Sequence, residues 1–167
     1  SCVLKMFTTS GVNPSVQSVD EIEKVFVEQL LMHIPNVGNV SDIFFYGAGC
    51  TPQRSSIVKD VFVNIGFSQT EILIESDILG AAKAVCGNSP GVVGILGTGS
   101  NSCRYDGEKI VENTPSLGFI LGDEGSGAYI GKRLVSDCLK GVLSERLSNI
   151  FLKETKLNVP LIIQKVY

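Results

Sequence analysis

The sequence predicts an α/β fold with a mixed β-sheet flanked by helices. Short apolar stretches alternate along the chain with longer stretches of helical periodicity. Several of these apolar stretches stop at glycine-rich turns, as strands do. Strand–helix–strand order favours parallel pairing, whereas one short glycine-rich connection favours an antiparallel hairpin. We therefore expect a sheet that is partly parallel and partly antiparallel.

The composition is that of a globular protein. The chain has 167 residues, of which 44% are hydrophobic and 19% charged, with a net charge of -3. It can bury one core and a smaller second one. Lys and Arg residues do not cluster as they do in a nucleic-acid-binding protein. No apolar run approaches the roughly 18 residues of a membrane span, and no signal peptide is visible. We expect a cytoplasmic protein without a nucleic-acid or membrane partner.

The first expected helix runs from Val19 to about Ile34, after a turn at residues 10–14. Its apolar residues recur at helical intervals. Ser18 is placed to cap this helix, and Glu21 completes a capping box three residues later.

Two strand–helix pairs follow. Ile43–Tyr46 is a short apolar strand that ends at Gly47-Ala48-Gly49, and a helix is expected from Gln53 to about Asn64. Glu71–Glu75 is the next strand, and the alanine-rich residues Asp77–Cys86 are its helix.

The remaining elements begin with a buried strand at Gly91–Leu96. A turn at residues 97–101 leads into a returning strand at Cys103–Tyr105, and Asn113–Gly122 is expected to be a loop. Three helices complete the prediction, at residues 124–141, 144–153 and 161–166.

Cysteine and histidine usage excludes several kinds of site. The five cysteines, Cys2, Cys50, Cys86, Cys103 and Cys138, are widely spaced and include no C-x-x-C pair. This spacing argues against a disulfide framework or a zinc site, so we expect reduced thiols that pack as small apolar residues, and we assign no metal ligand. The single histidine, His33, is expected to pack near a helix end.

The glycine-rich turn Gly97-Thr98-Gly99-Ser100-Asn101 is the first candidate site. Its backbone N–H groups can form an anion-binding nest, and the hydroxyls of Thr98 and Ser100 add donors. The alternative is an ordinary glycine-rich hairpin, since such a turn is not specific by itself.

Asp77 is the second candidate, because it stands where an apolar strand ends and a helix begins. Ligands of open α/β sheets lie beyond the carboxyl ends of the strands, and a carboxylate there can accept the proton of an attacking hydroxyl. The alternative is that Asp77 only caps its helix.

The third candidate is the stretch 118–127, in which glycines flank Asp123 and Glu124 before a helix. Asp123 can cap that helix, bind sugar hydroxyls, or do both. By contrast, Gly47-Ala48-Gly49-Cys50-Thr51-Pro52 is no dinucleotide loop, because Pro52 occupies the place of its last glycine, and no Walker motif is present.

Four segments together resemble the N-acetylglucosamine kinase branch of the BadF/BadG/BcrA/BcrD ATPase family, within the actin/hexokinase superfamily. They are S-G-V-N-P (10–14), E-S-D-I-L-G-A-A-K-A (75–84), G-I-L-G-T-G-S-N-S (94–102) and G-F-I-L-G-D-E-G-S-G-A-Y-I-G-K (118–132). The resemblance implies ribonuclease-H-like lobes, with ATP and an amino sugar bound between them.

This resemblance also implies roles for single residues. Asp77 is the expected general base toward the sugar 6-hydroxyl. Gly97, Thr98, Gly99 and Ser100 are expected to bind ATP phosphates, with Mg²⁺ neutralising charge, while Asn13, Asn101, Gly118 and Asp123 are expected at the sugar. The family also implies a homodimer. N-acetylglucosamine, glucosamine and a cell-wall-derived sugar all stay open as substrates.

The family pattern extends beyond this sequence. A phosphate loop of the D-x-G-x-[ST]-K-T type opens the family and does not precede Ser1, and a longer second lobe normally follows. We therefore expect an incomplete chain, with residues 1–90 in the first lobe and residues 91–167 at the start of the second. The alternatives to a sugar kinase are a BadF-type activator ATPase with an iron–sulfur cluster, and a non-catalytic sugar or ATP sensor.

Overall fold

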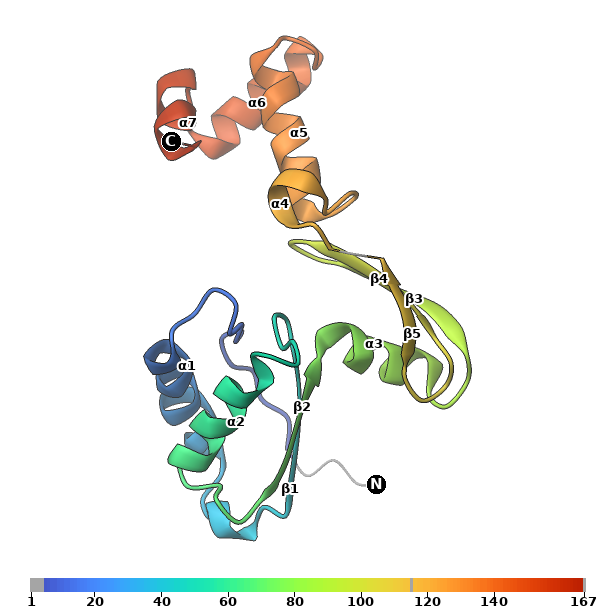
Figure 1. The fold of residues 1–167 in the computed structure, drawn as a ribbon. Coiled ribbons are helices and arrows are strands. Elements are labelled where there is room, and N and C mark those ends of the chain that lie inside the picture. The colour runs from blue at the N-terminus through green and yellow to red at the C-terminus, as the bar shows by residue number, and fades with distance from the viewer. Residues whose placement is uncertain (1–4, 115, 167) are drawn as a thin grey trace. The chain divides into compact units, whose positions relative to one another are not determined.

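A computed structural model describes residues 5–114 and 116–166, and Figure 1 draws their helices and strands. The chain divides into two compact units, one made of residues 1–94 and 102–113 and the other of residues 95–101 and 114–167. The boundary therefore falls inside a β-hairpin and not in a linker. Residues 102–113, which follow the turn of that hairpin, belong to the first unit.

The first unit is built on two parallel strands. β1 (Asp42–Gly47) pairs with β2 (Glu71–Ser76), with Asp42 opposite Glu71 and Gly47 opposite Ser76. The connection between them contains helix α2 (Ser55–Asn64), which lies with α1 on one side of the strands (Figure 1). This arrangement confirms the predicted strand–helix–strand order and its parallel pairing.

The first helical segment has the predicted extent but a mixed character. α1 covers Val19–Val25, and a π-helical stretch, Phe26–Leu30, and a 3₁₀ turn, Leu31–His33, continue it. The predicted capping box is confirmed. The Ser18 hydroxyl accepts the Glu21 N–H, and the Glu21 carboxylate accepts the Ser18 N–H at 2.8 Å.

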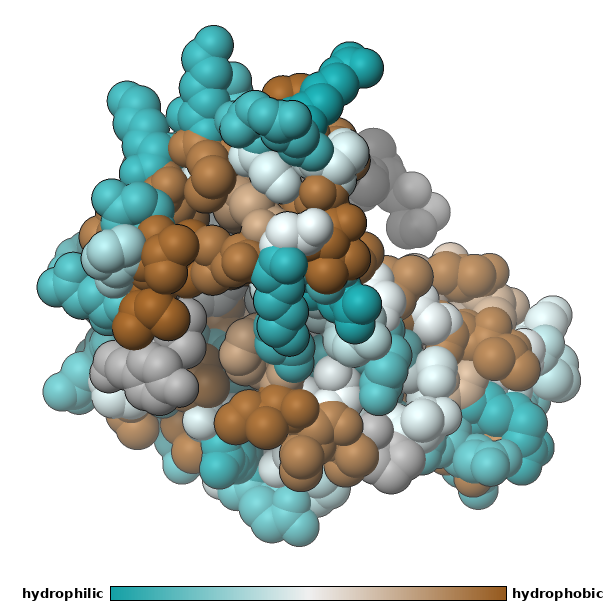
Figure 2. All heavy atoms as spheres, turned by 90° about the horizontal axis from the view of Figure 1, so that it is seen from above, coloured by the Kyte–Doolittle hydropathy of each residue, from teal (hydrophilic) through white to brown (hydrophobic). Residues whose placement is uncertain are grey.

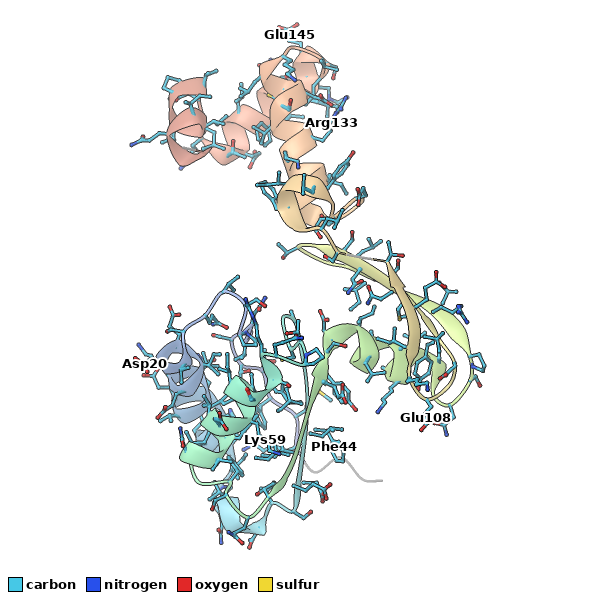
Figure 3. All side chains as sticks on the ribbon, viewed as in Figure 1. Asp20, Phe44, Lys59, Glu108, Arg133 and Glu145 are labelled. Carbon is cyan, nitrogen blue, oxygen red and sulfur yellow. The ribbon has the colours of Figure 1, made fainter. Side chains whose placement is uncertain are left out.

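The main hydrophobic core lies between these helices and strands. Phe26 stacks on Phe62 with ring centroids 4.4 Å apart, and Phe45 and Phe67 meet Phe62 edge-on. The strands bury only one face, because Phe44 is 66% exposed and points away from α1 and α2 (Figure 3). The buried members of this core are Ile22, Phe26, Cys50, Val58, Val61, Phe62, Phe67 and Ile72.

A helix and a three-stranded sheet follow. α3 (Asp77–Cys86) has the predicted bounds. β3 (Gly91–Leu96), β4 (Ser100–Tyr105) and β5 (Ile110–Thr114) form a sheet in the order β3-β4-β5. A three-residue turn joins β3 to β4, so these two strands form the predicted antiparallel hairpin.

Two predictions about this region were wrong. β3 is not a buried strand, since Val92 is 79% and Leu96 74% exposed and only Val93 is fully buried. An apolar run does not say how many faces of a strand are covered. The stretch 113–122 is also not a simple loop, because β5 ends in it and the short helix α4 (Gly118–Leu121) lies within it.

Helices dominate the second unit. α5 (Gly127–Leu139) begins later than the predicted Glu124, because Asp123 and Gly125 have φ angles of 60° and 75° and Ser126 caps the helix. α6 (Glu145–Thr155) and α7 (Val159–Val166) lie close to the predicted ranges. Figure 2 shows apolar side chains exposed among polar ones on the face it views.

The described cysteines are free thiols, as predicted. Cys50, Cys103 and Cys138 are buried and Cys86 is half-buried, while Cys2 lies outside the described residues. Among the described helices, none has both the length and the apolar character that a membrane span requires.

Candidate functional site

In the first unit, one turn brings two predicted site residues together. The turn follows β1 and runs through Gly49, whose φ is 74°, to Thr51. The Asn13 side chain packs against Gly49, so closely that a β-carbon at this position would overlap the Asn13 Oδ1. Asp77 lies near the same turn, because it follows Ser76, which pairs with Gly47 at the start of that turn. Asn13 and Asp77 therefore border one region, although 64 residues separate them in the sequence (77 − 13).

Asp77 stands at the first position of α3, just beyond the end of β2. Ser76 caps this helix by accepting the Leu79 N–H at 3.4 Å. Among the described residues, the Asp77 Oδ1 accepts only the N–H of the following residue, Ile78, at 2.8 Å. Since Ser76 already caps the helix, Asp77 is not needed for that role. Its Oδ2 makes no hydrogen bond within the described residues, so it is free to take a proton.

A cavity of about 470 Å³ lies between the turn after β1 and the end of β2, and the last residue of its lining is Ser76, the neighbour of Asp77 in the chain. Its wall is mostly polar and carries no Lys or Arg. Burial, and next the charge of Asp77, raise the pKa of the Cys50 thiol. Cys50 is therefore a protonated, unreactive part of the wall. The lining residues are Cys50, Thr51, Pro52, Ser55, Ile74, Glu75 and Ser76.

In the second unit, the glycine-rich turn is joined to the start of α5. The Gly127 N–H donates to the Gly97 carbonyl at 2.8 Å, and the Ala128 N–H donates to the Thr98 carbonyl at 3.1 Å. The Ser126 hydroxyl accepts the next N–H, that of Tyr129. The first N–H groups of α5 are thus occupied, so this helix end does not offer them to an anion.

Asp123 closes the other side of the turn. It is 9% exposed, and its Oδ1 accepts the Ser100 N–H at 3.1 Å and the Ser116 hydroxyl at 3.4 Å. A β-carbon on Gly99 would lie 2.9 Å from the same oxygen. Asp123 does not cap α5, because Ser126 does. Its Oδ2 makes no hydrogen bond within the described part of the chain and can accept one from a ligand hydroxyl.

The outer side of the turn fits a phosphate group better than its inner side. A β-carbon added to Gly97 would meet nothing within 4 Å, and Thr98 is exposed. The hydroxyls of Thr98 and Ser100 make no hydrogen bond within the described residues. The two hydroxyls are therefore available as donors on the outer side of the turn. On the inner side, Asp123 already accepts the Ser100 N–H.

Two further predicted residues lie in the second unit. The Asn101 Oδ1 is buried and has no hydrogen-bond partner among the described residues, which is costly unless a ligand or water supplies a donor. Gly118 has a φ of 72° with open space around its α-carbon, and it begins α4.

The sequence interpretation missed three supporting residues. Gln17 accepts the Asn13 N–H at 2.6 Å. Ser126, 1% exposed, caps α5. Lys132 donates to the Phe119 carbonyl at 2.8 Å and lies 4.8 Å from the Phe119 ring centroid, which ties α4 to α5. Only Ser126 had a local signal, since a serine before a helix is a usual cap.

The described residues contain no group of three or more His, Cys, Asp or Glu side chains that could hold a metal ion.

Comparison with solved structures shows a strong likeness to a protein of known structure. The crystal structure of a protein named "putative N-acetylglucosamine kinase", from Porphyromonas gingivalis, superposes with a TM-score of 0.88 at 41% sequence identity. The match covers 95% of this chain but 56% of that protein, so the chain spans little more than half of its relative. No family model matches the chain. No curated protein matches it either.

Proposed function

The chain belongs to the N-acetylglucosamine kinase-like family, and on this basis we propose that the protein transfers the γ-phosphoryl group of ATP to the 6-hydroxyl of an amino sugar. The substrate class includes N-acetylglucosamine and glucosamine. The observation that carries the proposal is the likeness to the Porphyromonas gingivalis protein over almost the whole chain. The position of Asp77 and the donors of the turn at residues 97–100 support it.

In this proposal Asp77 is the general base. Its free Oδ2 accepts the proton of the attacking hydroxyl, and the mostly polar cavity lined by the preceding residues, Glu75 and Ser76, provides room for a sugar. Asn13, Asn101, Gly118 and Asp123 border the sugar. Asp123 can accept from a sugar hydroxyl through Oδ2 because its Oδ1 is already bound by Ser100 and Ser116.

ATP with Mg²⁺ would supply the transferred phosphoryl group and the charge neutralisation it needs. The residues that would hold its phosphates are Gly97, Thr98, Gly99 and Ser100, through the outer side of their turn. The task of these residues is positioning, since phosphoryl transfer requires little covalent chemistry from the protein.

The structure gives no support to the activator alternative. An activator ATPase of the BadF type would use cysteines to bridge two subunits through an iron–sulfur cluster. Cys103 and Cys138 are 4% and 8% exposed, so neither is presented to a partner.

The test is ADP release by the full-length protein with ATP, Mg²⁺ and a panel of hexoses and amino sugars. We expect release to depend on an amino sugar, and Asp77→Asn to lower kcat by about a hundredfold or more, since general base catalysis contributes this much. Glu71→Gln, at the other end of β2, is the matched control. Sugar binding without ADP release would instead indicate a sensor.

The assembly and cellular location are further parts of the proposal. The family resemblance leads us to propose a cytoplasmic homodimer. Light scattering of the purified full-length protein would measure its mass, and a monomer mass would contradict the dimer.

A further inference from the structure

The Asn13 side chain is held in one orientation. Its Oδ1 accepts the N–H of Ser15 at 2.9 Å. Because a backbone N–H can face only an acceptor, this bond decides which end of the carboxamide is the oxygen. The two N–H groups on Nδ2 have no hydrogen-bond partner within the described residues, and the residue is only half-buried. Toward a ligand, Asn13 is therefore a donor.

Gln17 holds the backbone on which this side chain stands. Its Oε1 accepts the Asn13 N–H at 2.6 Å, and its Nε2 donates to the Gly11 carbonyl at 3.4 Å. The Gln17 N–H in turn donates to the Asn13 carbonyl at 3.0 Å. One glutamine thus bridges the loop before and after Val12 and leaves Asn13 little freedom.

Gly49 provides the surface against which the carboxamide rests. A β-carbon there would overlap the Asn13 Oδ1, and the Gly49 backbone already has a left-handed φ of 74°. The Ser15 hydroxyl also donates to the Gly49 carbonyl at 3.4 Å. The loop and the turn after β1 are therefore in direct contact, which only glycine permits at this position.

We propose that Gln17 and Gly49 are positioning residues that hold Asn13 as a fixed pair of donors for an acceptor oxygen of the sugar, either a hydroxyl or an amide carbonyl. This inference rests on the proposed function, in which Asn13 borders the sugar. An ammonium group has no lone pair and cannot accept from the Nδ2 N–H groups of Asn13.

Kinetics of the full-length protein test the inference. Gln17→Leu removes the acceptor for the Asn13 N–H, so we expect KM for the sugar to rise about tenfold with kcat nearly unchanged. Gln17→Glu puts a carboxylate oxygen in the place of the amide oxygen that accepts the Asn13 N–H, and loses only the longer Nε2 bond to the Gly11 carbonyl, so it should restore most of the affinity. Gln53→Leu is the matched control, because Gln53 is exposed and makes no hydrogen bond within the described residues.

A second readout does not depend on catalysis. In ¹⁵N-labelled protein, the Asn13 side-chain NH₂ signals should lie at shifts that differ from those of an unfolded chain in the unaltered protein and in Gln17→Glu, and should move toward the unfolded-chain shifts in Gln17→Leu. If the Asn13 signals change in Gln17→Leu and not in Gln17→Glu, but no sugar supports ADP release, the positioning role stands and the proposed kinase activity fails. Unchanged signals and unchanged KM in Gln17→Leu would overturn the positioning role. If Gln17→Glu lost as much sugar affinity as Gln17→Leu and also had a lower Tm, Gln17 would have only a structural role. This result would also overturn the positioning role.

Discussion

Asp123 combines an unfavourable backbone conformation with a buried carboxylate. Its φ of 60° is uncommon for a residue with a side chain, although Asp and Asn adopt it more readily than most. Two hydrogen bonds to its Oδ1, from Ser100 and Ser116, offset this cost. The residue therefore holds the glycine-rich turn in place in addition to its proposed contact with the sugar.

Substitution of Asp123 separates geometry from charge. Asp123→Asn keeps an acceptor and tolerates the left-handed region, so we expect it to change the free energy of unfolding by less than about 1 kcal/mol. Asp123→Ala loses the acceptor and tolerates the region poorly, so a loss of about 2–3 kcal/mol is expected. Urea denaturation measures both. Equal losses would mean that the negative charge, and not the acceptor geometry, holds the turn.

At the scale of elements, two helices contain an interior glycine for different reasons. A β-carbon on Gly80 in α3 would lie 2.7 Å from the Tyr46 Cβ on β1, whereas one on Gly131 in α5 would meet nothing within 4 Å. Gly80 thus permits close helix–strand packing, and nothing around Gly131 requires glycine.

These glycines form a matched pair of substitutions. We expect Gly131→Ala to stabilise the protein by about 0.5–1 kcal/mol, since alanine favours a helix over glycine. Gly80→Ala should destabilise it by about 1–3 kcal/mol, because the added methyl overpacks the contact with Tyr46. Thermal unfolding would check both signs. A more stable Gly80→Ala variant would show that α3 can move away from β1 without cost.

The capping box of α1 predicts a pH dependence. The Ser18 backbone and hydroxyl donate to the Glu21 carboxylate and lower its pKa in the folded state. A lowered folded-state pKa contributes stability that is present above the unfolded-state pKa and is lost as pH falls through the folded-state pKa. The unaltered chain should therefore lose more stability on acidification than Glu21→Gln, as measured by Tm across a pH series.

The hydroxyl of the same box is tested separately. Ser18→Ala should lower the free energy of unfolding by about 1 kcal/mol at neutral pH, because an unpaired N–H remains at the helix start. Ser68→Ala is the control, since Ser68 is exposed and its hydroxyl makes no hydrogen bond within the described residues. Equal effects of the two changes would argue against the cap.

At the scale of the whole molecule, buried apolar side chains are concentrated in the first unit. All eight buried residues of the main core belong to it, and Val58 and Val61 of α2 are fully buried. In the second unit, α6 contains no buried residue and α5 buries only Cys138. Local stability should follow this distribution, since it depends on buried apolar contacts.

Hydrogen exchange would measure that difference. We expect amides in the middle of α2 to exchange at least about tenfold more slowly than those in the middle of α6. Phe62→Ala should cost about 3–5 kcal/mol and accelerate exchange in α2, because Phe62 is stacked in the core. Equal protection of α2 and α6 would show that the two units unfold together.

The sequence alone determined the succession of elements. The signals that predict elements are local: helical periodicity, the capping box of Ser18 and Glu21, and glycines at turns. The start of α1, α2, α3 and the hairpin were therefore predicted closely. The sequence prediction failed where burial or backbone geometry decides. At β3, Val92 and Leu96 are exposed although Val93 is buried, and α5 begins only after Asp123 and Gly125 have turned the chain. Local composition does not show which faces of a strand or helix are covered by the rest of the molecule.

Tertiary structure alone decided how the candidate residues are arranged. The motifs identified Asp77, the turn at residues 97–101 and Asp123 as candidates. No spacing rule indicates that Asp123 occupies the Ser100 N–H, that Asn13 rests on Gly49, or that Gln17 holds Asn13 in place. The Asp123 and Gly49 contacts join residues 23 and 36 positions apart in the chain (123 − 100 and 49 − 13), and they form only when packing brings the segments together. Periodicity and capping are properties of neighbouring residues, whereas a site is a property of the folded chain.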